Sequence, residues 1–246
     1  MAEMEKSKPF NLIRIMPSEG DNILTSNIVY RTDIFCAVIL ILRRFHMETT
    51  QKKRMQRIYA LCQSSIFIAL ATILSFLPVY EMPMGGTVTL ASMLPILFIG
   101  IKFGAKWGLG SSFVYALIQL MQALIKGNVF VYCVGAGAVI ICALFDYIIP
   151  FSILGLSFIA SPKNGGKLSI VKALIVFGIL IFVRFLCHFV TGMVIWGQWA
   201  PEGMGAFVYS LVYNGSYMLP ELVVTLLVSG YLLTVSAVEK LLNKEN

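Results

Sequence analysis

The stretch IVKALIVFGILIFVRFLCHFVTGMVIW, residues Ile170–Trp196, decides the fold class of this chain. It contains only two charged residues, Lys172 and Arg184, and exceeds the roughly 20 apolar residues that a bilayer-spanning helix needs. Its apolar residues are continuous and do not alternate with period two, as they would in a barrel strand. The stretch therefore predicts a transmembrane helix.

The composition extends this prediction to the whole chain. Hydrophobic residues make up 58% and charged residues 13%, with a mean hydropathy of +0.84, which is too apolar for a soluble core. We predict an all-α, polytopic membrane protein with a bundle of six transmembrane helices. The expected spans are Ile58–Pro78, Val88–Phe103, Trp107–Leu124, Ile140–Ala160, Ile170–Trp196 and Phe207–Val238. An ordered outer loop or half-helix is expected before Ile140.

Basic residues predict the orientation, because Lys and Arg are enriched in cytoplasmic segments. They precede the first span and lie between the second and third, between the fourth and fifth, and after the last; the opposite loops contain Glu81, Glu202 and only Lys126. Both termini are therefore expected in the cytoplasm. The net charge of +7 follows from this topology, so no nucleic-acid partner is expected. The basic residues used are Lys52, Lys53, Arg54, Arg57, Lys102, Lys106, Lys163, Lys167, Lys240 and Lys244.

The first 46 residues do not fit the pattern. Their apolar segment Ile34–Leu42 is too short to span, and no small-residue cleavage site of a secretory signal follows it. Arg43 and Arg44 can be encoded as AGG-AGG, a bacterial ribosome-binding sequence placed shortly before the Met47 codon. We therefore expect residues 1–46 to be a non-native upstream extension or disordered, and residues 47–246 to form the membrane domain.

Several motifs are absent. The sequence has no GxxxxGK[ST] phosphate loop, so the chain is not expected to hydrolyse ATP itself. It has no HExxH motif and no CxxC pair among its five cysteines, so neither an intramembrane metalloprotease nor a zinc site is indicated. We expect no metal, no cofactor and no catalytic residue.

Aromatic and polar residues gather around the turn between the last two spans. The segment Arg184–Asn214, RFLCHFVTGMVIWGQWAPEGMGAFVYSLVYN, contains two Trp, two Tyr, one His and one Asn near this turn. Trp and Tyr are also common as interfacial anchors, but the amide of Asn214 has no anchoring use in lipid. Such a set suits a flat, cationic, hydrogen-bonding small molecule. The residues are His188, Trp196, Trp199, Tyr209, Tyr213 and Asn214.

Other polar residues inside the predicted spans have two readings each. Asp146, beside Tyr147, is interpreted as a partner for a positive ligand, with a structural pairing to Arg184 as the alternative. His188 shares a helix face with Arg184 and Gly192, and Gly192 is expected to leave room for access to the imidazole. His188 is interpreted as a ligand contact, with a satisfied core histidine as the alternative.

Arg184 and Glu221 each lie twelve residues inward from Trp196 and Tyr209, at a depth of about 18 Å in adjacent helices. The equal depth predicts a structural ion pair between Arg184 and Glu221, with a proton relay as the alternative.

The chain resembles a known family, the thiamine-specific substrate-binding (S) components of energy-coupling factor (ECF) transporters. The resemblance covers roughly Ser65 to Leu233. It is strongest in HFVTGMVIWGQWAPEGMGAFVYSLVYNG (His188–Gly215), supported by MPMGGTVTLASMLPI (Met82–Ile96) and LFDYIIPFSILG (Leu144–Gly155). It implies a six-helix bundle in the bacterial plasma membrane that binds thiamine near the outer face and relies on a transmembrane scaffold and two ATPase subunits for transport.

The resemblance also implies roles for individual residues. The family's binding histidine, stacking tryptophan, pocket tyrosine and pocket asparagine fall on His188, Trp196, Tyr209 and Asn214. Its acidic ligand residue, a glutamate, falls on Asp146 with Tyr147 beside it. A second family tryptophan aligns with Gly86, so Tyr80 or Tyr132 is expected to supply the missing aromatic ring. The family's AxxxA docking motif reads Ser65 and Ala69, whose small side chains favour a closely approaching scaffold helix.

Two alternatives remain from the sequence. An S component for another vitamin or for a thiamine precursor would keep the bundle and change the pocket. An intramembrane enzyme would use Asp146, His188 and Glu221 in acid-base chemistry.

Overall fold

The computed structural model describes residues 23–82, 85–127, 130–162 and 166–242, and of residues 23–48 only the backbone. The chain divides into two units, Met1–Gln56 and Arg57–Asn246, and each is described by itself. Helix α1 runs over Ile23–Ser75, so it begins well before the expected Ile58. The part of the first 46 residues that is described is therefore helical, whereas residues 1–22 lie outside the described residues. The start of translation at Met47 stays a prediction.

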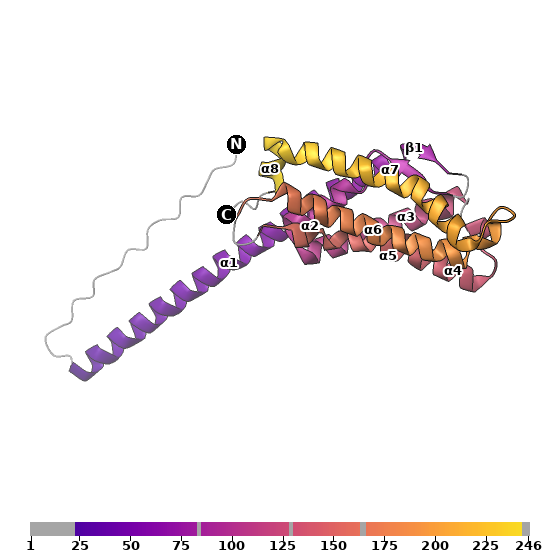
Figure 1. Cartoon of the computed structure of the whole chain (residues 1–246). Helices are drawn as coiled ribbons and strands as arrows, with labels where there is room; N and C mark the ends of the chain where they lie inside the picture. Colours follow the sequence, from indigo (N-terminus) through magenta and orange to yellow (C-terminus); the bar gives the residue numbers. More distant parts are fainter. Residues whose placement is uncertain (1–22, 83–84, 128–129, 163–165, 243–246) are drawn as a thin grey trace, which may run out of the picture. The chain divides into compact units, whose positions relative to one another are not determined.

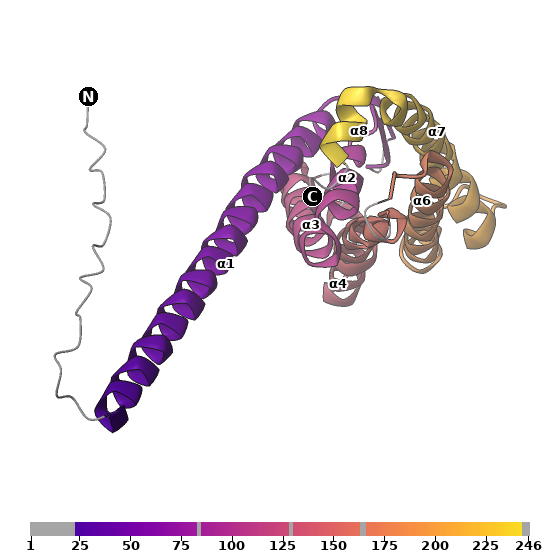
Figure 2. The same cartoon turned by 90° about the vertical axis from the view of Figure 1, so that its left-hand side faces the viewer.

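The second unit is a bundle of apolar helices. Within the described residues, five helical segments are long and apolar enough to cross a membrane, which confirms an all-α, multi-pass membrane protein. Figure 1 shows α6 (Ile170–Val194) and α7 (Ala206–Thr234) side by side in opposite directions, and Figure 2 views the bundle from its end. The five segments are Thr49–Ser75, Ala105–Lys126 (α3), Ala136–Ala160, Ile170–Val194 and Ala206–Thr234.

The second predicted span is shorter than expected. Helix α2 covers only Leu94–Phe103, and the residues before it form strand β2 (Thr87–Thr89), paired antiparallel with β1 (Pro78–Glu81). The prediction of a span from Val88 was therefore wrong at its beginning. Pro95 occupies the first turn of α2, where its missing N–H costs no hydrogen bond.

Helix α2 lies at the centre of the core. Nearly all its residues are buried, among them Ile96, Leu97 and Ile99. A Cβ built at Gly155 would lie 2.6 Å from the Gly108 carbonyl oxygen, and one at Gly108 would lie 2.9 Å from Gly100 Cα. Three backbones therefore approach each other where only glycine fits, as is common in membrane helix packing.

The fourth span is not a regular α-helix around Asp146. It consists of α4 (Ala136–Cys142), a π-helical turn η2 (Ala143–Ile148), α5 (Ile149–Ser152) and a 3-10 segment η3 (Ile153–Ala160). Pro150 has no N–H to donate to the carbonyl of Asp146, which disturbs the α-helical hydrogen bonds of this turn. The π-helical turn contains Asp146, and such turns are frequent at functional sites.

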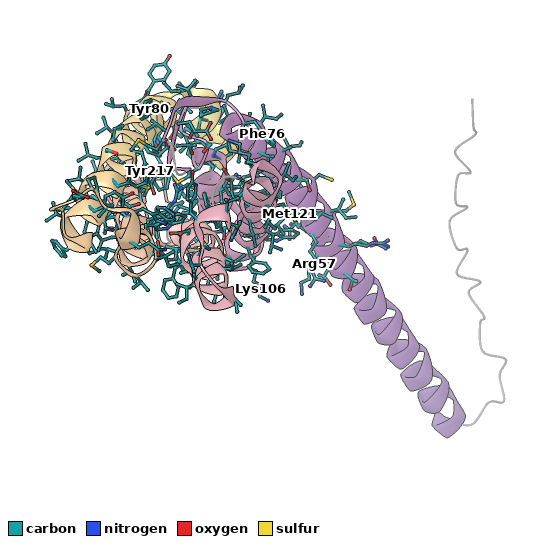
Figure 3. The ribbon with its side chains drawn as sticks, turned by 90° about the vertical axis from the view of Figure 1, so that its right-hand side faces the viewer. Arg57, Phe76, Tyr80, Lys106, Met121 and Tyr217 are labelled. Atoms are coloured by element: carbon teal, nitrogen blue, oxygen red, sulfur yellow. The ribbon has the colours of Figure 1, made fainter. Side chains whose placement is uncertain are left out.

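The remaining boundaries agree closely with the sequence predictions. Residues before α4 form a 3-10 turn η1 (Phe130–Tyr132), as the expected outer loop required. Helix α6 ends at Val194 and is followed by a 3-10 turn η4 (Trp196–Trp199), and α7 is followed by α8 (Ser236–Leu242). In Figure 3, Tyr80 and Met121 point outward from the bundle and Tyr217 points inward. The cytoplasmic location of both termini stays a prediction.

Candidate functional site

A cavity lies at the end of the bundle where α6 and α7 are joined through η4. Its empty volume of about 720 Å³ includes space that is open to the surroundings. All six residues predicted to bind a ligand line it: Asp146, Tyr147, His188, Trp196, Tyr209 and Asn214. The structure thus brings together residues from η2, α6, η4 and α7.

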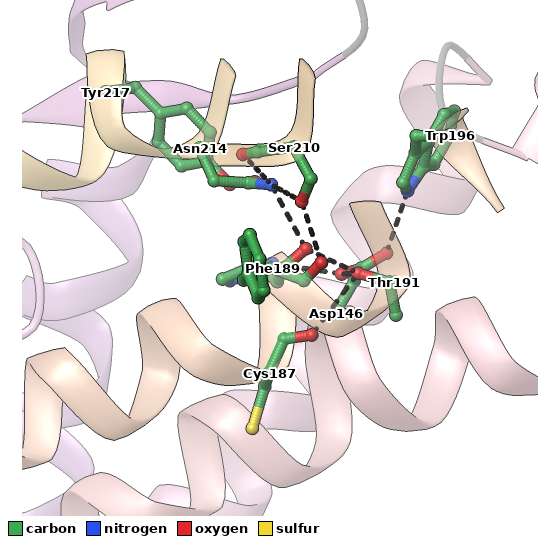
Figure 4. Close-up of polar contacts among 9 residues, drawn as sticks. Asp146, Cys187, Phe189, Thr191, Trp196, Ser210, Asn214 and Tyr217 are labelled. Atoms are coloured by element: carbon green, nitrogen blue, oxygen red, sulfur yellow. Dashed lines mark hydrogen bonds and ion pairs between the residues drawn. The ribbon is translucent and has the colours of Figure 1, made fainter. Parts of the chain in front are cut away.

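Asp146 is the focus of the polar contacts in this cavity. Its side chain accepts hydrogen bonds from His188 Nδ1 at 3.0 Å, from Trp196 Nε1 at 3.4 Å and from the Thr191 hydroxyl. Figure 4 shows Thr191 and Trp196 directed at the carboxylate. Asp146 is only 7% exposed. Three donors hold it in one orientation, and none of them belongs to Lys or Arg.

The ring of His188 has one nitrogen bound and one open. Because Asp146 accepts from Nδ1, this nitrogen carries the proton in the neutral ring, and Nε2 is left as an acceptor. Nε2 is buried and has no hydrogen-bond partner in the part of the chain that the structure describes. The free acceptor in a cavity wall matches a ligand with an N–H donor, such as an exocyclic amine.

Asn214 holds α7 against α6. Its amide nitrogen donates to the His188 carbonyl oxygen at 3.1 Å and to the Ser210 carbonyl oxygen at 3.0 Å, and its Oδ1 accepts from the Tyr217 hydroxyl at 2.9 Å. The Ser210 hydroxyl adds a bond to the Phe189 carbonyl oxygen at 2.7 Å. Asn214 therefore positions His188 in addition to lining the cavity.

Gly192 has a different role from the one expected. A Cβ at this position would lie 2.7 Å from Asn214 Nδ2 and 2.8 Å from Ser210 Cβ, and still closer to Ser210 Oγ. The space beside Gly192 is thus filled by Ser210 and Asn214 of α7. Gly192 lines the cavity, but the steric reason for a glycine is the close approach of the two helices.

The β1–β2 hairpin supplies another wall through Gly85, Gly86 and Thr87. A Cβ at Gly86 would lie 2.6 Å from the ring of Tyr217, so Tyr217 is the aromatic residue that packs against this glycine. Neither Tyr80 nor Tyr132, the residues expected to replace the missing ring, lines the cavity. Tyr80 is 57% exposed.

Tyr132 packs against two tryptophan side chains. It makes edge contacts with Trp196 and Trp199, at ring-centroid distances of 6.3 and 5.5 Å. Tyr132 therefore supports the orientation of Trp196 from outside the cavity.

The predicted ion pair between Arg184 and Glu221 is not formed between these two described side chains. Glu221 is 2% exposed and accepts from Thr89 at both oxygens, from the backbone N–H at 2.5 Å and from the hydroxyl at 2.7 Å. The Arg184 guanidinium lies 4.3 Å from the centroid of Phe151 and contacts Met93 Sδ at 2.7 Å. Arg184 and Glu221 are both buried, but their side chains contact different partners.

The two residues predicted to dock a scaffold helix are exposed. Ser65 and Ala69 both lie on an exposed face of α1. Cys62, Cys142 and Cys187 are free thiols, and burial raises the pKa of the Cys133 thiol, which keeps it protonated. No group of three metal-ligating side chains occurs among the described residues.

Several residues of the candidate site were missed from the sequence. Thr191, which donates to Asp146, and Tyr217, which lines the cavity, each lie three residues after a predicted residue, His188 and Asn214. This helical spacing was an available signal. Gln119 on α3 gave no signal, because it lies in an apolar span without a neighbouring motif. Phe151 on α5 lies within the family-like segment Leu144–Gly155, but its apolar side chain did not stand out in a membrane span. Both line the cavity.

Comparisons with known proteins agree with this architecture. The model of the family described as "Thiamine transporter protein (Thia_YuaJ)" matches residues 61–241. The chain is 32% identical over 190 residues to the thiamine transporter ThiT of Bacillus subtilis (strain 168), covering 72% of this chain and 90% of the relative. It is 27% identical over 191 residues to ThiT of Lacticaseibacillus paracasei, covering 74% of this chain and 90% of the relative.

A solved structure has the same fold. ThiT from Listeria monocytogenes, determined by native-SAD phasing, is 26% identical and superimposes with a TM-score of 0.60 over 76% of this chain and 98% of its own length. Together with the family match, which extends over most of the chain, this likeness leads to one conclusion: the chain belongs to the thiamine transporter protein family.

Proposed function

We propose that this chain captures thiamine at the outer face of the membrane as the S component of an ECF-type vitamin importer. The observation that supports this most strongly is the carboxylate of Asp146. It is buried in a membrane span, accepts bonds from the side chains of His188, Thr191 and Trp196, and has no Lys or Arg at ion-pair distance among the described residues. Because an uncompensated charge in a membrane protein is costly, this site is suited to a cationic ligand.

The chemistry of thiamine matches the rest of the cavity. Its thiazolium ring carries a permanent positive charge, and the faces of Trp196 and Tyr147 offer cation-π and stacking contacts of roughly 0.5–2 kcal/mol each. Its aminopyrimidine carries an exocyclic amine that suits the open Nε2 of His188. One ligand can therefore use both the aromatic faces of Trp196 and Tyr147 and the open nitrogen of His188.

Transport is proposed to depend on partners. The small side chains of Ser65 and Ala69 are exposed on α1, where a scaffold helix can approach closely, and the scaffold would be driven by two ATPase subunits. The chain itself is proposed to release its ligand unchanged and to be no enzyme.

Ligand binding by the purified chain tests the proposal. Thiamine should quench tryptophan fluorescence saturably, because Trp196 lines the cavity, whereas riboflavin, folate and biotin should not compete. Mass spectrometry of the material that co-purifies with the chain provides a second readout. Binding of another vitamin without binding of thiamine would contradict the proposal, and conversion of thiamine by the chain would favour the intramembrane enzyme.

A pair of charge variants tests the role of Asp146. A unit charge about 4 Å away contributes about 4 kcal/mol at an effective dielectric constant of 20. Asp146→Asn should therefore weaken thiamine binding by up to roughly a thousandfold. Glu202→Gln removes one negative charge from the exposed outer loop, away from the cavity, and should change the affinity less than about twofold. Equal effects of the two variants would refute a direct role for Asp146.

A further inference from the structure

Gln119 is a polar side chain of the cavity wall that the protein itself does not use. It lies on α3, about two turns from the outer end of that helix, and lines the cavity together with Thr87 and Phe151. Its amide nitrogen is buried and, within the described residues, has no hydrogen-bond partner. A primary amide inside a membrane span is costly when it is unpaired, so its presence calls for a partner.

The same helix contains a second amide that shows the structural arrangement. Gln122, one turn further along α3, is buried and lies next to Ser75 of α1. Its Nε2 donates to Ser75 Oγ at 3.1 Å, and its Oε1 lies 3.3 Å from the same oxygen. Gln122 thus joins two helices, whereas the amide nitrogen of Gln119, which lines the cavity, has no hydrogen-bond partner among the described residues.

The position of Gln119 complements that of the predicted binding residues. Asp146, His188 and Asn214 belong to η2, α6 and α7. Gln119 comes from α3, an element that contributes no predicted binding residue. His188 Nε2 and Gln119 Nε2 are both buried cavity-wall atoms without a partner, so a ligand that fills the cavity from one element to the other satisfies both.

We propose that the amide of Gln119 hydrogen-bonds the bound ligand and is a further determinant of affinity. The inference rests on the proposed thiamine site. Thiamine offers acceptors in its pyrimidine nitrogens and its primary hydroxyl, and an amide can meet either of them. Because a ligand without a group at this point leaves the amide buried and unpaired, Gln119 selects against such ligands.

Matched substitutions in the full-length chain test this role. Gln119→Met keeps the approximate volume and helix propensity of the side chain and removes the amide. In the ligand-free protein it should leave the melting temperature unchanged or raise it, because an unpaired buried group is lost. It should weaken thiamine binding roughly tenfold, the value of one hydrogen bond. Gln122→Met should do the reverse, lowering the melting temperature and changing the affinity less than twofold.

The outcomes are separable. Failure of the wild-type chain to bind thiamine would overturn the proposed function and this inference with it. Normal binding by the wild type and equally tight binding by Gln119→Met would overturn the inference alone, as would a lower melting temperature of Gln119→Met with unchanged affinity. If Gln119→Met folds poorly, Gln119→Ala makes no steric demand, and the same weakening of thiamine binding is expected from it.

Discussion

Replacing Gly192 with Ala is expected to push α6 and α7 apart at the centre of the candidate site. The new methyl group would lie 2.7 Å from Asn214 Nδ2 and 2.8 Å from Ser210 Cβ, well inside the usual contact distance of roughly 3.5–4.0 Å between non-bonded atoms. Neither neighbour moves freely. Asn214 is bonded to the His188 carbonyl oxygen, and the Ser210 hydroxyl is bonded to the Phe189 carbonyl oxygen.

The magnitude follows from these constraints. Overpacking by one methyl group typically costs about 1–3 kcal/mol, and displacement of α7 also lengthens the bond from Asn214 to His188, worth about 0.5–1.5 kcal/mol. A gain of several tenths of a kcal/mol from the better helix propensity of Ala offsets part of this. We expect the unfolding free energy to fall by about 1–3 kcal/mol and thiamine affinity to fall at least tenfold.

The assay combines thermal unfolding in detergent with thiamine titration, and the same helix offers a control. A Cβ at Gly178, also on α6, would meet nothing within 4 Å. Gly178→Ala should therefore be neutral or stabilising by up to about 1 kcal/mol, with unchanged affinity. The double variant Gly192→Ala, Ser210→Gly removes the obstructing side chain and should recover part of the lost affinity.

Two results would refute the reasoning. Unchanged affinity and stability in Gly192→Ala would show that α7 yields without cost, and the close approach would then not position Asn214. Normal stability together with lost affinity that Ser210→Gly does not recover would instead indicate that the methyl group blocks the ligand, as the sequence first suggested.

Three further predictions concern the surroundings of the cavity. Trp196→Ala should weaken thiamine binding more than tenfold, because it removes an aromatic face and a donor to Asp146. Trp199 is not among the residues that line the cavity, so Trp199→Ala should change the affinity less than threefold. Equal losses of affinity in the two variants would contradict this prediction. Glu221→Gln leaves one Thr89 donor without its acceptor. It should lower the unfolding free energy by about 1–3 kcal/mol and reduce thiamine affinity less than tenfold. A larger loss of affinity at an unaltered melting temperature would count against a structural role for Glu221. Ser65→Leu should leave thiamine binding intact and reduce uptake into cells that contain the scaffold and ATPase subunits, and undiminished uptake would argue against docking at this face.

The extent of the helices was predictable because it depends on local composition. The long apolar runs predicted α3, α6 and α7 to within four residues at each end, except that the last predicted span continued across the break before α8. The beginning of α2 was not predictable in this way. Thr87–Thr89 is apolar enough on average to continue a span, but its backbone pairs with Pro78–Glu81, a contact that hydropathy does not register.

The candidate site shows the same division between local and non-local information. His188, Asn214 and Asp146 were found because their residue types are unusual in apolar spans, and Trp196 because it lies near the turn between the last two spans; resemblance to a family then gave each of them a role. The partners of charged residues were not found. Depth along a helix follows from residue number, whereas the direction in which a side chain faces a neighbouring helix depends on how the helices pack, and this separated Glu221 from Arg184.

By itself, the sequence determined that this chain is a helical membrane protein and which residues are chemically suited to a cationic, aromatic ligand, because both follow from residue type and spacing along one helix. Only the tertiary structure decided what each of these residues contacts. It gave Asp146 three donors, placed Tyr217 against Gly86, assigned Gly192 to helix packing and left the amide nitrogen of Gln119 without a hydrogen-bond partner among the described residues. The physical reason is that hydrogen bonds and close packing join atoms from different helices, and the distances between those atoms are set when the bundle assembles.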